Sequence, residues 1–86
     1  MYYVYVLWSK SYSCRYIGST EDVENRLKQH NSGESKYTSG RIPWVVIYTE
    51  IFPLKTIALK REKFLKTGQG RKWLDEKLRS LNSGIV

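Results

Sequence analysis

The residues of this chain whose chemical types could act together are two tyrosines, an arginine, a histidine and a glutamate. They are Tyr5, Tyr16, Arg26, His30 and Glu62. Phenol and imidazole groups exchange protons, a guanidinium binds phosphate through two parallel hydrogen bonds, and a carboxylate binds a hard divalent cation. These groups are sufficient to cut a phosphodiester with one metal ion, provided that the fold brings them together.

The two tyrosines lie eleven residues apart, on what we expect to be adjacent strands of one hairpin. Residues 2–8 and 15–19 are rich in β-branched and aromatic side chains, which predicts strands on either side of a polar turn. Gly18 indicates a bend or a close approach of the backbone. Tyr5 and Tyr16 can therefore lie near each other across the ladder, as ordinary aromatic packing or as part of a site.

Arg26 and His30 are predicted to project from one face of a helix, because four residues span just over one turn. Thr20 is the expected N-cap of this helix and Gly33 its expected end. The pair could be a solvated face on which the histidine interacts with the helix dipole. Because the helix begins beside the end of the hairpin, Arg26 could instead hold a phosphate while His30 positions a tyrosine hydroxyl or a phosphate oxygen.

Glu62 falls on the apolar face of a later predicted helix, between Ala58 and Leu65. A carboxylate in this position loses solvation unless it is paired or binds a cation. Arg61 or Lys66 could supply the pair. Alternatively, a divalent cation held by one carboxylate, water and substrate phosphate is typical of Mg²⁺.

The whole pattern predicts an α+β fold, a three-stranded antiparallel sheet with helices packed on it in the order ββαβαα. The third strand is expected over residues 44–51 and the later helices over 56–67 and 71–81. The first strand is nearly continuously apolar, so we expect it at the centre of the sheet. Residues 1–86 are too few for a second domain and are expected to form one. The last helix is predicted to bury Trp73, Leu74, Leu78 and Leu81.

Positive charge is concentrated in the second part of the chain. The formal net charge is +7, yet residues 1–54 carry six Lys and Arg against five Asp and Glu, whereas residues 55–86 carry nine against three. This asymmetry predicts a polyanionic partner, nucleic acid, with DNA as the expected form. Tyr37, on a long loop, could stack on a base. The basic residues expected to contact the nucleic acid are Lys36, Lys60, Lys63, Lys66, Arg71 and Lys72.

The single cysteine, Cys14, cannot form a disulfide within the chain and fits a reducing compartment. We see neither a secretory signal nor a stretch long enough to span a membrane, and therefore expect a cytoplasmic protein. We expect it to be a monomer.

The ordered set Tyr3-Val4-Tyr5, Tyr16-Ile17-Gly18, Arg26, His30 and Glu62 resembles the GIY-YIG nuclease domain, in its small single-domain form. The resemblance runs from about Tyr2 to Leu74 and includes His30-Asn31-Ser32-Gly33 and Pro43-Trp44. Two features depart from the family pattern. Only the final tyrosine of the first triplet matches, and the asparagine that many members carry after the glutamate is absent between Asn31 and Asn82. Gln69 or Lys66 could take over its contact.

The resemblance implies a metal-dependent endonuclease that leaves 5′-phosphate and 3′-hydroxyl ends. It implies that Tyr5 is the general base for the attacking water and that Tyr16 positions that water or the phosphate. Arg26 would neutralise developing charge, His30 would hydrogen-bond near Tyr5, and Glu62 would bind a single Mg²⁺ or Mn²⁺. We expect Arg26, the cation and a protonated His30 to favour the phenolate of Tyr5.

No added recognition module is visible, so we expect the substrate to be selected by shape or strandedness rather than by sequence. The main alternative is a non-catalytic nucleic-acid-binding module with the same fold, which metal-dependent nicking would distinguish. A protein-interaction domain would expose a large apolar patch, whereas we assign Trp8, Trp44 and Trp73 to the core.

Overall fold

The computed structural model describes residues 1–83 and contains one three-stranded antiparallel sheet. Its strands are β1 (Tyr2–Ser9), β2 (Cys14–Thr20) and β3 (Trp44–Phe52), in the spatial order β2-β1-β3. β1 is therefore the central strand, as its continuous apolar run predicts, and β2 is one of the two edges. The hairpin between β1 and β2 is confirmed, and Ser9 pairs with Cys14 at its closed end.

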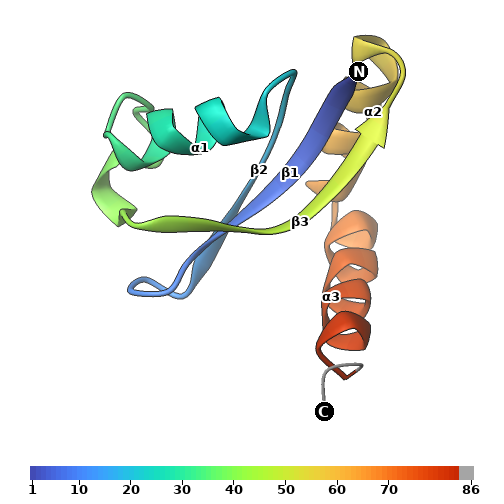
Figure 1. Cartoon of the computed structure of the whole chain (residues 1–86). Coiled ribbons are helices and arrows are strands. Elements are labelled where there is room, and N and C mark those ends of the chain that lie inside the picture. Colours follow the sequence, from blue (N-terminus) through green and yellow to red (C-terminus); the bar gives the residue numbers. More distant parts are fainter. Residues whose placement is uncertain (84–86) are drawn as a thin grey trace.

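Three α-helices complete the predicted ββαβαα order. They are α1 (Val23–Asn31), α2 (Lys55–Leu65) and α3 (Gly68–Ser83), with one short 3₁₀ turn at Ser39–Arg41. α1 lies on one side of the sheet, whereas α2 and α3 lie on the other (Figure 1). None of the helices within residues 1–83 combines the length and the apolar composition needed to cross a membrane.

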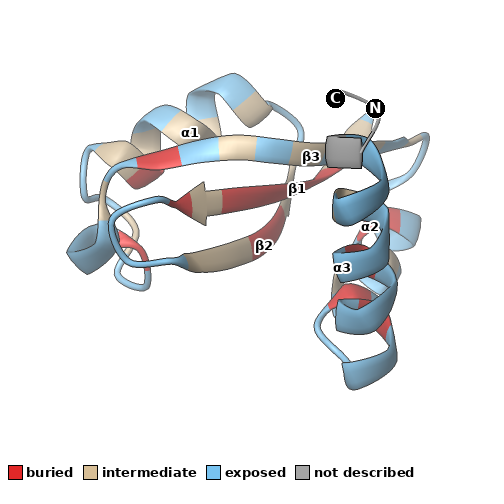
Figure 2. Ribbon diagram, turned by 90° about the horizontal axis from the view of Figure 1, so that it is seen from below, coloured by how far each residue is buried: buried red, intermediate tan, exposed pale blue. Residues whose placement is uncertain are grey.

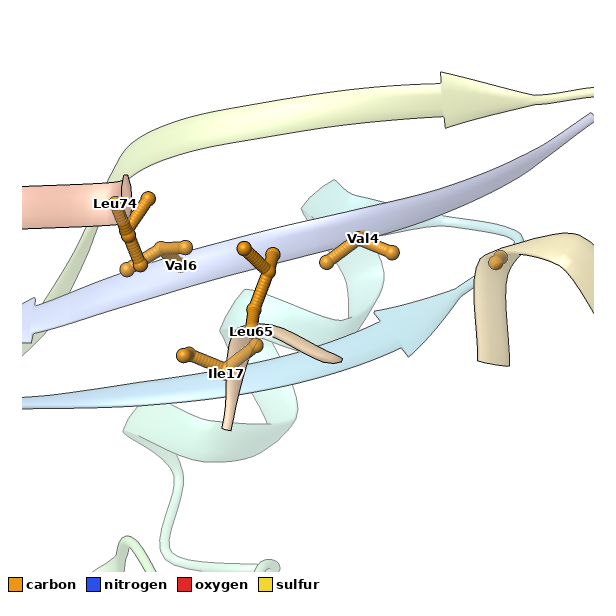
Figure 3. Packing of buried hydrophobic residues seen from close by; sticks show 6 residues of the cluster. Val4, Val6, Ile17, Leu65 and Leu74 are labelled. Carbon is orange, nitrogen blue, oxygen red and sulfur yellow. The ribbon is translucent and has the colours of Figure 1, made fainter. Parts of the chain in front are cut away.

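Each face of the sheet has its own apolar cluster, because side chains alternate between the faces along a strand. On the α1 side, the buried residues are Tyr5, Leu7 and Trp44, with Val23 and Leu27 of α1 against them. Figure 2 shows that buried residues concentrate on the strands and on the inward sides of the helices. The buried residues on the α2 and α3 side, most of them labelled in Figure 3, are Val4, Val6, Ile17, Ala58, Leu65 and Leu74.

Two predicted helix boundaries are wrong because side-chain caps replace the expected ones. Asp22, not Thr20, is the N-cap of α1, and its carboxylate accepts the Asn25 backbone N–H at 3.0 Å. α3 begins at Gly68 rather than at residue 71. There the Thr67 hydroxyl accepts the Gly70 backbone N–H at 3.1 Å, so the glycine-containing segment is helical.

Two residues of α3 that were predicted to be buried are partly exposed, Trp73 at 36% and Leu81 at 46%. Trp73 instead stacks on the Arg61 guanidinium, whose carbon lies 4.4 Å from the ring centroid. Arg61 in turn forms two hydrogen bonds with the Glu50 carboxylate, at 2.8 and 3.0 Å. This network connects β3, α2 and α3, and it pairs Arg61 with Glu50 rather than with Glu62.

Candidate active site

Tyr5 and Tyr16 lie on the α1 side of the sheet with their ring centroids 6.3 Å apart. They are not direct cross-strand partners, because Tyr5 pairs with Gly18 and Tyr16 pairs with Leu7. Gly18 leaves room for the Tyr5 ring, since a Cβ at this position would lie 2.5 Å from Tyr5 Oη and 2.7 Å from Cζ. The close approach expected at Gly18 is therefore that of a phenol to the backbone.

His30 extends from α1 into the space beside both tyrosines and is fully buried. Its Nε2 lies 2.9 Å from Tyr5 Oη, and its ring centroid lies 4.9 Å from that of Tyr16. The interpretation of His30 as part of a solvated helix face is therefore wrong. On the other side of the ring, Nδ1 lies 2.7 Å from the Thr38 hydroxyl.

The directions of the two hydrogen bonds made by the His30 ring follow from the Thr38 hydroxyl. The Thr38 hydroxyl can donate to the Ser35 carbonyl, at 3.5 Å, while its oxygen accepts the His30 Nδ1–H at 2.7 Å, and we assign the hydrogen bonds in this way. This arrangement assigns the neutral tautomer in which Nε2 carries a lone pair. Tyr5 then donates its hydroxyl proton to Nε2. The Tyr5 hydroxyl, the His30 ring, the Thr38 hydroxyl and the Ser35 carbonyl thus form one hydrogen-bonded relay from β1 to the loop after α1.

The loop of residues 32–43 is held at its base, which fixes Thr38 beside His30. The Asn31 side chain accepts the Trp44 backbone N–H at 2.6 Å and donates to the Trp44 carbonyl at 3.0 Å. The Trp44 indole N–H donates to the Thr38 carbonyl at 3.0 Å. Thr38 is consequently 1% exposed, although the residues on either side of it are exposed.

Arg26 lies one turn before His30 on α1, as the spacing predicts. Its pKa is raised above the ordinary value, chiefly by hydrogen bonding to the Tyr5 hydroxyl and also through its interaction with Tyr16. One guanidinium nitrogen also donates to Gln29 Oε1 at 2.8 Å. A cation is thus held at the two phenols, where an approaching anion would meet it.

Glu62 lies on the α2 side of the sheet, opposite the phenols, and contacts the edge strand β2. Ser19 of β2 donates its hydroxyl proton to Glu62 Oε1 at 2.6 Å, and Lys66 Nζ lies 2.7 Å from Oε2. The predicted ion pair with Lys66 is thus present. The Glu62 charge also contributes to raising the pKa of Tyr5, so it lies within electrostatic range of that phenol.

Burial outweighs the neighbouring cation in setting the acidity of Tyr5. Desolvation raises the pKa of this phenol to about 12, against an ordinary 10.0, and the Arg26 hydrogen bond only partly offsets it. Arg26 acts in the expected direction, but the expected lowering of the Tyr5 pKa is not found. Burial, followed by the charge of Arg26, lowers the pKa of His30, which is therefore neutral at pH 7. His30 cannot supply the protonated imidazole that was expected to favour the phenolate.

The carboxylate of Glu62 fits a cation that takes most of its ligands from water and substrate. Among residues 1–83, no group of three or more His, Cys, Asp or Glu side chains could enclose a metal ion. The Glu62 side chain is 20% exposed, so at least part of it is accessible to solvent. A cation at Oε2 would have to displace the Lys66 ammonium, which is itself 48% exposed.

Two of the predicted nucleic-acid contacts line a cavity of about 640 Å³ outside β2, namely Lys66 and Arg71. Lys36 lines a smaller hollow with Tyr37. The other predicted contacts, Lys60, Lys63 and Lys72, are exposed on α2 and α3. Gln69, one candidate for the missing asparagine, is exposed in the first turn of α3.

Two hydrogen-bonding residues of the site were not identified from the sequence, Thr38 and Ser19. Thr38 gave no signal, because its place beside His30 depends on the clamp at the base of the loop. Ser19 could have been found, since strand alternation puts it on the face of Ile17, which α2 covers. Its neighbour Gly18 then faces α1 and the two tyrosines, whereas Ser19 faces α2 and Glu62.

Comparison with known proteins identifies the family of this chain. The GIY-YIG catalytic domain matches residues 1–75. A UPF0213 protein of Halalkalibacterium halodurans is 43% identical over 84 residues, covering 96% of this chain and 86% of that protein. One from Staphylococcus saprophyticus is 40% identical over 74 residues, covering 85% of this chain and 89% of its own length.

A solved structure shares the fold. The solution NMR structure of the UPF0213 protein BH0048 from Bacillus halodurans has a TM-score of 0.53 and is 38% identical. The match covers 88% of this chain and 84% of the BH0048 chain. The domain match, the sequence relatives and the shared fold lead to one conclusion: the chain belongs to the GIY-YIG family, a nuclease family, and within it to the small UPF0213 proteins.

Proposed function

We propose that this protein is a metal-dependent endonuclease that hydrolyses nucleic-acid phosphodiester bonds, and that it selects its substrate by strand structure rather than by sequence. The observation that carries the proposal is the 2.9 Å contact between Tyr5 Oη and His30 Nε2, in a buried relay beside Arg26. A buried structural tyrosine also needs an acceptor for its hydroxyl proton, but it needs no cation beside that hydroxyl, whereas a general base does.

Tyr5 is the proposed general base. With a pKa of about 12, only about one Tyr5 in 10⁵ is ionised at pH 7, so a preformed phenolate is scarce. The relay offers another route. As the attacking water passes a proton to Tyr5 Oη, the phenol passes its own proton to His30 Nε2, the oxygen of the water bonds to phosphorus, and the bond from phosphorus to the 3′-oxygen breaks. Thr38 retains the Nδ1–H bond and stabilises the imidazolium so formed.

Arg26 and Tyr16 are the proposed phosphate-side groups. The guanidinium interacts electrostatically with both phenols, and it can pair with phosphate oxygens as negative charge develops. Tyr16 lies beside Tyr5 and lines the cavity outside β2, which suits it to position the water or the phosphate.

Glu62 is the residue that would hold the divalent cation, Mg²⁺ or Mn²⁺, with Ser19 fixing the orientation of its carboxylate. When bound, such an ion supplies charge stabilisation to the phosphate and to the leaving 3′-oxygen. Lys66 pairs with this carboxylate, and its ammonium could pair with phosphate instead if a cation took its place.

A non-catalytic nucleic-acid-binding module remains the second candidate function, and the Lys66–Glu62 ion pair is the observation that favours it. If the ammonium permanently took the place of the cation, the basic surface would remain and cleavage would be lost. The two candidates differ in turnover, not in binding.

The decisive experiment is a cleavage panel with end-labelled single-stranded, duplex and branched DNA and single-stranded RNA, in Mg²⁺ and in EDTA. We expect Mg²⁺-dependent cutting that favours unpaired or branched DNA, loss of cutting in Glu62→Gln, and normal cutting in Glu76→Gln, a matched exposed carboxylate of α3. No Mg²⁺-dependent cutting of any substrate would contradict the proposal. Cutting of a long duplex into a few discrete fragments would contradict the selectivity.

We further propose that residues 1–86 act as one domain, as a monomer and in the cytoplasm. The free thiol of Cys14 supports a reducing compartment. Light scattering coupled to size exclusion tests the oligomeric state, and a dimer mass would contradict it. Fractionation of cells that produce the protein tests the location.

A further inference from the structure

The cavity of about 640 Å³ outside β2 joins the two halves of the candidate active site. We call it the β2-edge cavity, and its lining residues are Arg15, Tyr16, Ile17, Tyr37, Lys66 and Arg71. They come from the β2 edge, from the loop after α1, and from the α2–α3 junction. Because Tyr16 lies beside Tyr5, the cavity adjoins the two phenols. Because Lys66 pairs with Glu62, the cavity also adjoins that carboxylate.

The lining combines aromatic rings with cations. Arg15 is oriented by Asp75, at 2.6 Å, and Lys66 by Glu62, at 2.7 Å. Among residues 1–83, no carboxylate forms a salt bridge with Arg71. The size of the cavity is within the range of about 300–1,000 Å³ that is usual for small-ligand sites. Such a cavity suits a ligand that carries both a flat ring and a phosphate.

Tyr37 is an exposed aromatic ring at this cavity, the kind of side chain on which an unpaired base stacks. Its side chain is 85% exposed, although it lies at the cavity rather than on a remote loop tip. In a duplex the faces of the bases are covered by their neighbours, so an aromatic ring cannot stack on them and only phosphates, sugars and base edges can contact the protein. An unpaired base has a free face, which a tyrosine ring can cover.

We propose that the β2-edge cavity holds an unpaired nucleotide of a single-stranded nucleic acid, with its base on Tyr37 and its flanking phosphates on Lys66 and Arg71. The proposal rests on the proposed function in that this strand is the substrate. Because Tyr16 and the partner of Glu62 line the same cavity, the bound nucleotide would adjoin the phosphate that is cut. The unpaired base would then be the source of strand selectivity.

Equilibrium binding in EDTA tests this proposal without any catalytic step. The probes are a fluorescein-labelled oligothymidylate of about 12 nucleotides and a labelled duplex of the same length, followed by fluorescence anisotropy. We expect the wild type to bind the single strand more tightly than the duplex. Tyr37→Ala should weaken single-strand binding by at least about fivefold and leave duplex binding unchanged, because a base stacked on an aromatic ring contributes about that much or more.

Matched variants separate stacking from charge and from loss of folding. Tyr37→Phe keeps the ring and should bind as the wild type does. Arg71→Ala should weaken both probes and reduce the salt dependence, with a slope smaller by about 0.7 for the single strand. Tyr12→Ala and Lys10→Ala remove an exposed tyrosine and an exposed lysine of the hairpin turn and should change single-strand binding by less than Tyr37→Ala and Arg71→Ala do.

The proposal is overturned if Tyr37→Ala and Tyr12→Ala bind the single strand equally well, or if the wild type prefers the duplex. It is also overturned if thymidine monophosphate competes as strongly as the oligonucleotide, since the site would then take a free nucleotide. Tyr37-dependent binding without cleavage in Mg²⁺ would support this site and refute the nuclease. Cleavage in Mg²⁺ with no effect of Tyr37→Ala on binding would support the nuclease and refute this site.

Discussion

Replacing Tyr5 by phenylalanine should lower both stability and activity, for separable reasons. The side chain is 1% exposed, and its hydroxyl is the partner of Nε2 of the fully buried His30. Removing it leaves a buried acceptor without a hydrogen bond, which costs about 1–3 kcal/mol. For a domain of this size, that corresponds to a decrease in Tm of roughly 4–24 °C. Loss of the general base should lower the cleavage rate by about 10²- to 10⁴-fold.

Thermal unfolding followed by circular dichroism measures the first effect, and single-turnover cleavage well below the lower Tm measures the second. Two variants serve as controls. Tyr12→Phe removes an exposed hydroxyl and should change stability by less than about 0.5 kcal/mol. Thr38→Val leaves the His30 Nδ1–H without its partner, so it should destabilise the fold similarly but slow cleavage less. A folded Tyr5→Phe protein that cuts within tenfold of the wild-type rate would refute the role of Tyr5.

Three further predictions concern packing, metal affinity and alkaline pH. Gly18→Ala should destabilise the fold by about 1–3 kcal/mol in denaturant titrations, because its Cβ would meet the Tyr5 hydroxyl at 2.5 Å; unchanged stability would refute that packing. Lys66→Ala should increase Mn²⁺ affinity in calorimetry by up to about fivefold, since it removes the ammonium that occupies the Glu62 carboxylate, and weaker binding would contradict this. Burial and the Glu50 hydrogen bond raise the pKa of Tyr48 to about 12, so unfolding releases its proton between pH 10 and 12 and the free energy of unfolding falls as pH rises there. Tyr48→Phe should reduce that slope by up to about 1.4 kcal/mol per pH unit, and an equal slope in both proteins would be the contrary result.

The sequence predicted the parts of the site that depend on local periodicity. Alternation along the hairpin placed Tyr5 and Tyr16 on one face, and helical spacing placed Arg26 and His30 together. The continuous apolar run of β1 indicated its central position. These relations involve residues close in the chain or joined by one turn, so a repeat of two or of 3.6 residues is sufficient to predict them.

The rest depends on contacts between segments distant in the chain. The position of Thr38 results from the pairing of Asn31 with Trp44 across the loop. The contact of Glu62 with Ser19 depends on which face of the sheet α2 covers, and no periodicity within α2 encodes this. The raised pKa of Tyr5 has the same origin, because burial by α1 and β2 outweighs the nearby guanidinium.

The central claim is that groups from both faces of the sheet act on one phosphodiester at the β2 edge. A double-mutant cycle in single-turnover cleavage, with Tyr5→Phe, Glu62→Gln and the combination, tests it most directly. Residues that act as a unit show strongly non-additive losses. We predict that each single variant loses at least about 10²-fold and that the double variant is little slower than the worse single one. Losses that multiply, or single variants that retain wild-type rates, would contradict the claim.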